Sequence, residues 1–304
     1  DKNMIKKIAI MFLVIVTVCS CFVACNNDEI PEGTKMLSFS QAQSVENIKD
    51  MDGQTVSMIG YMSTLSPVSG KFMYLMNLPY QSCPFCIPNT TTLSNTIAVY
   101  AKNEFEFTDR AIQVVGTLEV GDWTDEFGYQ YSYRIKDATY EILNTEDMSD
   151  ELKQWQALAA SGVVGDIYAM YDYVNFICFW AEYTAQFGDS SDYIYPDDVY
   201  GFMQTNSQYG YASDANYFNN LITRVEEVDK TAFADLVANI RAAEELATFA
   251  KSELESGNYT KVSEYSGVFR DGRQQYKMNK VDEFASKFQK TYNGFATWLS
   301  QWEL

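Results

Sequence analysis

Histidine is absent from this sequence, and its absence excludes several common kinds of active site. Without an imidazole side chain the protein can form neither a Ser-His-Asp triad nor a Cys-His pair, and it lacks the usual general base near neutral pH. Zinc sites that contain histidine are excluded as well. Hydrolysis by paired carboxylates stays open, although no such pair stands out in the sequence. We therefore expect no catalytic residues, no metal and no cofactor.

Basic residues are also scarce. The sequence contains 22 lysines and arginines but 41 acidic residues, so its net charge is −19. Nucleic acids and anionic lipid surfaces are polyanions, so this balance disfavours both as partners. Hydrophobic residues make up 47% of the 304 positions, which is typical of a globular protein. A chain of this length has room for two domains with ordinary cores.

The first residues form a basic and then strongly apolar leader. Three lysines precede the apolar run of residues 8–18, which is the pattern of a secretory signal. Residues 22–25, with the sequence FVAC, resemble the bacterial lipobox, in which the peptide is cut before the cysteine and the thiol is diacylated. This resemblance implies a signal peptide over residues 1–24 and a lipid on Cys25.

Residues 25–37 then form the lipidated cysteine and an expected flexible tether, because they contain Pro31 and Gly33 and no hydrophobic periodicity. Two acyl chains are sufficient for stable anchoring. We therefore expect attachment to the membrane through the N-terminal diacylglycerol-cysteine, outside the cytoplasm. Cleavage before Cys21 is one alternative, and an uncleaved membrane-spanning helix is the other.

Residues 38–145 are predicted to form a β domain, after one short helix that Ser38 or Ser40 can cap. Alternating residues and turn signals predict five strands. Gly60 and Gly116 stand where a strand must bend sharply, which suits a small closed barrel. The expected strands have the sequences QTVSMIGYMSTL, KFMYLMN, TIAVYA, AIQVVGTLEV and YQYSYRIKDATYEIL.

Three segments of this region resemble an OB-fold-type domain found in uncharacterised bacterial surface lipoproteins. They are DGQTVSMIGYM, the unit MNLPYQSCPFCIPN followed by NTIAVYA, and IQVVGTLEVGDWTDEFGYQYSYRIKDATYEIL. The resemblance covers about a third of the chain, the β part only. Its most specific element is the Leu-x-Pro-Tyr…Cys segment between the second and third strands. It implies an exported OB-like barrel and brings no established activity.

Residues 146–304 show the apolar period of helices instead. A helix is expected to begin at Ser149 and to be interrupted near Gly162, another to run over residues 231–256, and a last one over residues 281–302. Shared apolar stripes predict an antiparallel bundle of four to five helices. The expected fold class is therefore α+β with two domains, a small OB-like five-stranded β-barrel followed by an antiparallel α-helical bundle.

Cys83 and Cys86 form the only CxxC of the sequence, CPFC. A redox role needs the first cysteine at a helix N-terminus, and the residues that follow, IPNTTT, are poor helix formers. A metal site needs further soft ligands, and the sequence has neither a second CxxC nor a histidine. Outside the cytoplasm an oxidised pair that tightens a loop is the expected state, and a redox pair is the alternative.

Tyrosine is abundant, with 22 residues, and one group of tyrosines lies in a non-periodic stretch rich in Gly, Asn, Asp and Gln. Tyrosine rings beside amide side chains suit the recognition of a sugar or a peptide. A long connection packed by its own rings is the alternative. If this stretch forms a ligand groove, we expect the groove where the following residues meet the barrel: Tyr193, Tyr195, Tyr200, Tyr209 and Tyr211.

Two acidic clusters offer oxygen atoms to a calcium ion, but neither has the spacing of a calcium-binding loop. Asp122, Asp125 and Glu126 are expected in a turn over residues 121–128, and the second cluster lies in GDSSDYIYPDD. Solvated acidic loops are therefore the expected interpretation.

Together these features predict a membrane-anchored extracytoplasmic lipoprotein that acts as a non-catalytic binding or assembly module at the cell surface. Its further partner would be an unknown protein, small molecule or glycan. Nucleic acid is not expected, because residues 52–143 hold ten acidic residues and five basic ones. The alternative is an extracytoplasmic thiol-disulfide protein that uses Cys83 and Cys86.

Overall fold

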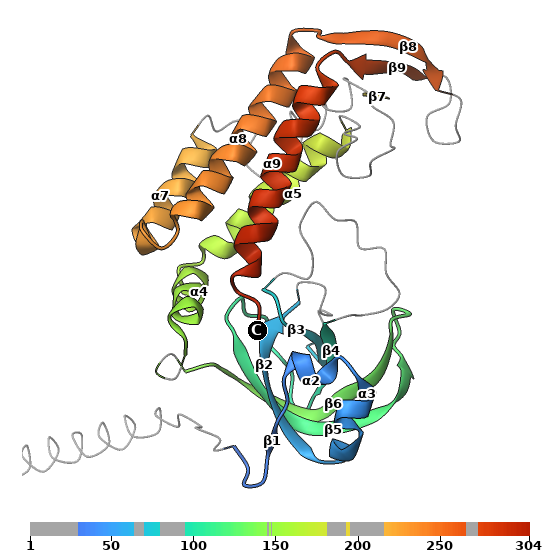
Figure 1. The fold of residues 1–304 in the computed structure, drawn as a ribbon, viewed down its shortest axis with the longest axis vertical. Coiled ribbons are helices and arrows are strands. Elements are labelled where there is room, and N and C mark those ends of the chain that lie inside the picture. Colours follow the sequence, from blue (N-terminus) through green and yellow to red (C-terminus); the bar gives the residue numbers. More distant parts are fainter. Residues whose placement is uncertain are drawn as a thin grey trace, which may run out of the picture. The chain divides into compact units, whose positions relative to one another are not determined.

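The computed structural model describes residues 30–63, 70–79, 95–144, 146, 148–180, 193–194, 216–265 and 273–304. For residues 175–180, 193–194, 261–265 and 273–277 it describes the backbone alone. Residues 35–304 group into one compact unit and residues 1–34 into another. The described part is α+β, as predicted, with a mixed six-stranded sheet, a three-stranded sheet and seven α-helices (Figure 1).

The larger sheet consists of six strands: β1 (Lys35–Met36), β2 (Thr55–Met62), β3 (Phe72–Met76), β4 (Thr96–Ala101), β5 (Ile112–Thr124) and β6 (Gln130–Ile142). Their order is β1-β2-β3-β4-β6-β5, and β2 also pairs with β5. Each of the five longer strands therefore pairs with two of the others. The β1–β2 and β4–β6 pairs are parallel, whereas the remaining pairs are antiparallel.

The five strands predicted from the sequence are all present within a few residues of their expected ends. Regular secondary structure, however, includes two residues of the segment that was expected to be flexible. Lys35 and Met36 lie in the segment predicted to be a tether, yet they pair with Val56 and Ser57 of β2. Leu37 is buried in the core of the sheet.

Two short helices and a 3-10 turn replace the single predicted helix before β2: α2 (Phe39–Ala42), α3 (Val45–Ile48) and η1 (Lys49–Met51). Ser38 caps α2, as predicted. Its hydroxyl accepts a hydrogen bond of 3.2 Å from the backbone N–H of Gln41, whose side chain accepts one of 3.0 Å from the backbone N–H of Ser38. Phe39 and Ile48 join the core of the sheet. Val45, at the start of α3, is exposed.

β2 confirms the predicted alternation on one side and departs from it on the other. Val56 and Met58 belong to the core of the sheet. Ser57 and Tyr61, on the opposite side, are also buried. Tyr61 belongs to the core of the helices, and its hydroxyl donates a hydrogen bond of 2.8 Å to the carbonyl oxygen of Trp302. The end of β2 is therefore covered on this second side by the helical region.

The turn between β5 and β6 is shorter than predicted. β5 runs past Gly121 and Asp122, so both residues lie in a strand. One carboxylate oxygen of Asp125 accepts hydrogen bonds of 2.9 Å and 3.0 Å from the backbone N–H groups of Phe127 and Tyr129, which closes the turn. The two strands consequently form a long hairpin, and this hairpin forms part of the candidate site.

Five helices follow in the C-terminal region: α4 (Asp150–Ala160), α5 (Val163–Trp180), α7 (Tyr217–Asp229), α8 (Ala234–Glu255) and α9 (Val281–Ser300). Ser149 caps α4 by accepting a hydrogen bond of 3.2 Å from the N–H of Leu152. Gly162 separates α4 from α5 with a φ angle of +76°, and Gly257 ends α8 with a φ angle of +67°. Glycine adopts this left-handed conformation at little cost, so both predicted helix ends are confirmed.

A three-stranded sheet lies within the region that was predicted to form a helical bundle. β8 (Tyr259–Tyr265) and β9 (Arg273–Met278) join the end of α8 to the start of α9, and β7 (Tyr193–Ile194) pairs with β9. These strands are short and mostly polar, so they carry no alternating apolar pattern that would reveal them. The predicted helical bundle did not include this sheet.

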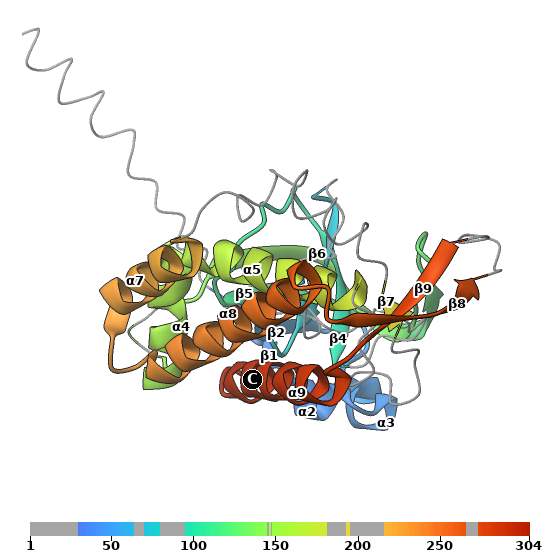
Figure 2. The same ribbon diagram turned by 90° about the horizontal axis from the view of Figure 1, so that it is seen from above.

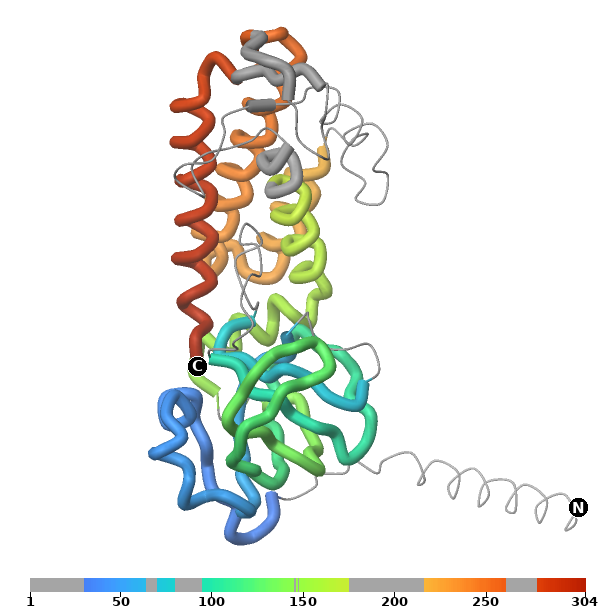
Figure 3. The backbone as a smooth tube through the Cα atoms, turned by 90° about the vertical axis from the view of Figure 1, so that its right-hand side faces the viewer, coloured from blue at the N-terminus to red at the C-terminus, as the bar shows by residue number. Residues whose placement is uncertain are grey.

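The helices pack around a core that is distinct from the core of the larger sheet. Figure 2 shows α5, α7 and α8 side by side, and Figure 3 shows α9 alongside α8, running in the opposite direction. No helix among the described residues is long and apolar enough to cross a membrane.

Two side chains of α4 attach the helices to the sheet. Nε1 of Trp155 donates a hydrogen bond of 2.8 Å to the carbonyl oxygen of Asp109. The buried amide of Gln156 accepts one of 2.9 Å from the N–H of Ala111 and donates one of 3.3 Å to the carbonyl oxygen of the same residue. The start of β5 is thus held by the first helix of the C-terminal region.

Candidate functional site

Most residues predicted to form sites lie outside the described part of the chain: Cys25, Cys83, Cys86, Tyr195, Tyr200, Tyr209 and Tyr211. Tyr193 opens β7 and pairs with Lys277 of β9. The lipid site, the cysteine pair and the tyrosine groove therefore remain predictions.

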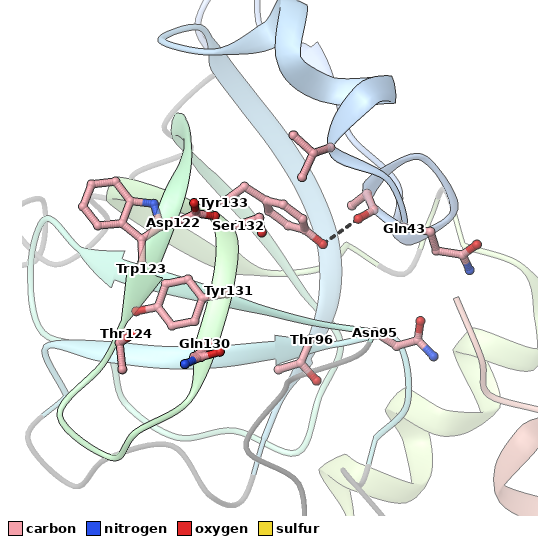
Figure 4. Close-up of a pocket in the computed structure, with 12 residues that line it drawn as sticks. Gln43, Asn95, Thr96, Asp122, Trp123, Thr124, Gln130, Tyr131, Ser132 and Tyr133 are labelled. Carbon is pink, nitrogen blue, oxygen red and sulfur yellow. Dashed lines mark hydrogen bonds between the residues drawn. The ribbon is translucent and has the colours of Figure 1, made fainter.

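A groove of about 670 Å³ opens on the larger sheet, between the hairpin of β5 and β6, the start of β4 and the segment that joins α2 to α3 (Figure 4). We call it the hairpin groove. Its described lining combines aromatic rings, amides, hydroxyls and one carboxylate: Ala42, Gln43, Val45, Asn95, Thr96, Asp122, Trp123, Thr124, Gln130, Tyr131, Ser132 and Tyr133. A concave site of this volume, with apolar surface and a few placed polar groups, is typical of a site for a small ligand.

Trp123 and Tyr131 come from opposite positions of the hairpin. They are direct cross-strand partners, and a register shift between Val120 and Trp123 alters the course of β5 just before this pair. Side chains of directly opposite residues lie on the same face of a hairpin. Figure 4 shows the two rings close together, with their broad sides turned toward the viewer.

Arg134 holds the indole ring of Trp123 in place. Its guanidinium carbon lies 3.5 Å from the centroid of that ring and 5.1 Å from the centroid of Tyr100, so both contacts are cation–π interactions. Glu119 binds Nε of Arg134 at 2.8 Å and the ammonium group of Lys136 at 3.2 Å. Burial alone would raise the pKa of Glu119, but the hydrogen bonds and charges of the two cations outweigh it and hold the pKa below its ordinary value. Glu119 is therefore ionised at neutral pH and keeps Arg134 against the indole.

The hydroxyl of Tyr131 is used within a cluster of aromatic residues. The hydroxyl oxygens of Tyr131 and Tyr100 lie 2.7 Å apart in a hydrogen bond. In the same cluster, Phe72 stacks on Tyr100 with ring centroids 5.3 Å apart, and the hydroxyl of Tyr74 donates a hydrogen bond of 2.5 Å to Asp125. What Tyr131 offers to the groove is therefore its ring and not its hydroxyl.

Tyr133 fixes the opposite wall of the groove. Its hydroxyl donates a hydrogen bond of 2.6 Å to the carbonyl oxygen of Ala42, drawn as a dashed line in Figure 4. This bond ties the end of α2 to β6 and places Gln43 at the edge of the groove. Asn95 stands at another edge with a φ angle of +54°, a conformation that asparagine tolerates better than most residues.

The indole nitrogen of Trp123 has an unmet hydrogen-bonding capacity. Nε1 is buried and has no acceptor among the described residues. Leaving a buried donor without an acceptor costs about 1–3 kcal/mol. Figure 4 shows this nitrogen on the side of the ring that faces Asp122.

The hydroxyls of Tyr74 and Tyr131 are expected to ionise late in an alkaline titration. Burial raises the pKa of both above the ordinary value of 10.0, and the hydrogen bonds to Asp125 and Tyr100 raise it further. A tyrosine whose pKa is raised by folding stabilises the folded state fully below its unfolded pKa, and this stabilisation is lost as the pH rises through the folded pKa. An absorbance titration should therefore show a fraction of tyrosines that ionises only as the full chain unfolds.

The variant Tyr74→Phe should remove amplitude from this late fraction. If the substitution instead removed amplitude from the tyrosines that ionise near the ordinary value, Tyr74 would not be protected in the way the structure indicates.

The hairpin groove was not predicted from the sequence. Trp123, Tyr131 and Tyr133 were not singled out, and Asp122 was assigned to an acidic turn. A usable signal exists at the start of β6, where Tyr129, just before the strand, and Tyr131 stand two positions apart and pack in the same aromatic cluster. Alternation places such rings on one side of a strand.

No protein-family model matches this chain, and no curated protein matches its sequence significantly. Within the described ranges, no three Asp, Glu or Cys side chains gather in a way that could hold a metal ion. The chemistry of the hairpin groove is therefore the basis on which a function can be inferred.

Proposed function

We propose that this chain is an extracytoplasmic lipoprotein, anchored through a diacylated Cys25, that acts as a non-catalytic binding or assembly module at the cell surface. The observation that carries the binding role is the lining of the hairpin groove, where the rings of Trp123 and Tyr131 lie among amide and hydroxyl side chains. The basic and apolar leader over residues 1–24 supports export.

At a finer level we propose an OB-like five-stranded β-barrel followed by a helical bundle domain. Two observations support the barrel. Each of β2 to β6 pairs with two of the others, and β4 and β6 are parallel although their neighbours are antiparallel. The distinct cores of the sheet and of the helices support the division into two domains, with α4 and the bond from Tyr61 to Trp302 among the contacts between them.

The side chains that line the groove are better suited to binding a ligand than to catalysing a reaction on it. Asp122 is the one ionisable carboxylate among its described lining residues. Hydrolysis of a glycosidic bond normally requires a pair of carboxyl groups on either side of that bond. The hydroxyls of Tyr131 and Tyr133 are occupied by hydrogen bonds to Tyr100 and to Ala42.

Metabolic labelling with a fatty acid tests the anchoring role. In cells that express the full chain, we expect the native protein to be labelled and to sediment with membranes. The variant Cys25→Ala should lose the label, because the thiol that receives the diacylglycerol is gone. The matched variant Cys21→Ala, at the competing position, should keep it. Equal labelling of the native chain and Cys25→Ala, or location of the protein inside the cytoplasm, would contradict the proposal.

A further inference from the structure

We propose that the hairpin groove binds a short neutral oligosaccharide, with one sugar ring stacked on the surface formed by Trp123 and Tyr131. This inference rests on the proposed binding function and names the chemical class of its ligand. Four features of the groove lead to it: its aromatic surface, the rigidity of that surface, its uncharged polar rim and its charge.

The aromatic surface matches the apolar face of a sugar. A pyranose ring carries axial C–H bonds on its faces and hydroxyl groups around its edge. The C–H bonds have a slight positive charge and are attracted to the negative face of an aromatic ring. Trp123 and Tyr131 are cross-strand partners, so their rings present a combined surface from one side of the hairpin (Figure 4).

The surface is held in position before any ligand arrives. Arg134 lies 3.5 Å from the centroid of the Trp123 ring and is itself bound by Glu119 at 2.8 Å. Tyr131 is held through its hydroxyl by Tyr100 at 2.7 Å. Because these side chains are ordered by protein contacts, a ligand would not have to order them, and that favours affinity.

The rim offers groups that match sugar hydroxyls. Gln43, Asn95 and Gln130 are exposed at the edge of the groove, and their side-chain amides make no hydrogen bond to any residue that the structure describes. An amide has both a donor and an acceptor, as a hydroxyl does, so it can bind two neighbouring hydroxyls at once.

The charge of the groove selects against acidic ligands. Asp122 is the one charged side chain among the described lining residues, and the net charge of the chain is −19. The cation beside the Trp123 ring, Arg134, is already paired with Glu119, so the groove offers no unpaired positive charge to a phosphate, sulfate or uronate. A volume of about 670 Å³ leaves room for a short oligosaccharide. The ligand class that fits all of these observations is a neutral glycan.

Isothermal titration calorimetry of the full chain in detergent tests the inference. The probes are maltotriose, cellotriose, xylotriose and chitotriose, with trigalacturonate as the acidic counterpart. We expect at least one neutral trisaccharide to bind and trigalacturonate not to bind. The variants Trp123→Ala and Tyr131→Ala should each weaken binding by roughly tenfold or more, because each removes half of the stacking surface.

Two controls separate loss of binding from loss of folding. Phe107→Ala removes an aromatic ring that is 52% exposed and does not line the groove, so binding should be unchanged. Tyr131→Phe keeps the ring but loses the bond to Tyr100, so it should recover most of the binding that Tyr131→Ala loses. Circular dichroism should show that each variant remains folded.

Three results would overturn the inference: no neutral trisaccharide binds, the acidic trisaccharide binds more tightly than the neutral ones, or folded Trp123→Ala and Tyr131→Ala bind as the native chain does. Each of these outcomes can occur while Cys25 is still labelled and the protein is still exported. Failure of the glycan inference is thus distinguishable from failure of the proposed lipoprotein function.

Discussion

Replacing Trp155 by alanine is expected to lower the free energy of unfolding by about 3–5 kcal/mol, as for other large aromatic residues in protein cores. Its side chain is 1% exposed. The ring contacts Tyr61 edge to face at 5.9 Å between centroids, and it contacts Trp298 and Trp302 at 6.2 Å and 5.8 Å. Alanine would leave a cavity where α4, β2 and the end of α9 meet.

The hydrogen bond from Trp155 Nε1 to Asp109 would be lost in the same variant. Trp155→Phe separates the two effects, because it keeps most of the ring contacts and should cost only about 1–2 kcal/mol. Gln154→Ala, on the less buried side of α4, should change stability by less than about 0.5 kcal/mol. Urea unfolding followed by circular dichroism measures all three. A Trp155→Ala variant as stable as Gln154→Ala would show that the described junction is not formed.

A methyl group at Gly116 is expected to lower the free energy of unfolding by roughly 1–3 kcal/mol, the usual cost of inserting an atom into a close-packed site. A Cβ atom there would lie 2.6 Å from a methyl carbon of Ile135 and 2.7 Å from the carbonyl oxygen of Lys136. The carbonyl belongs to the backbone of β6, so the clash cannot be relieved by a side-chain rotation. The register of β5 against β6 shifts at this residue as well.

Gly165→Ala provides the matched control, because a Cβ atom at Gly165 would meet no atom within 4 Å. Gly165 lies in α5 with its helical backbone exposed, so alanine should stabilise the protein by up to about 1 kcal/mol. The two substitutions add the same methyl group. In the same urea unfolding experiment they should change the free energy of unfolding in opposite directions. Equal effects would mean that β5 and β6 do not approach each other as described.

Helix ends and strand positions were predictable because they depend on local chemistry. Ser38 and Ser149 cap their helices through bonds to residues three positions away, and Gly162 and Gly257 end helices through their own backbone conformation. Such signals are complete within a few residues of the chain, so a single sequence contains them.

The β8–β9 hairpin could not be predicted, because its strands carry no local signal of this kind. Its strands have the sequences YTKVSEY and RQQYKM, in which apolar and polar residues do not alternate regularly. α7 begins at Tyr217, inside the tyrosine-rich stretch whose composition indicates a loop. In the hairpin the structure depends on pairing between the two strands and not on a local alternating pattern.

The hairpin groove depends on the same kind of long-range contact. Its lining comes from four short segments, residues 42–45, 95–96, 122–124 and 130–133, which are brought together by strand pairing and by the bond from Tyr133 to the end of α2. The sequence indicated that tyrosines beside amides suit a sugar, but it pointed to the stretch after residue 193. The place of the hairpin groove could not be predicted, because no local pattern of the sequence brings these four segments together.

Saturation-transfer difference NMR can show whether the hairpin groove binds a neutral sugar without converting it. With the full native chain and the neutral trisaccharide that binds in calorimetry, saturation of the aromatic protons should reach the C–H protons of the sugar. The transfer should be largely lost in Trp123→Ala, and the trisaccharide should be recovered intact. Equal transfer to the sugar in both proteins would contradict binding on the ring of Trp123. Release of smaller sugars during the measurement would contradict a non-catalytic role.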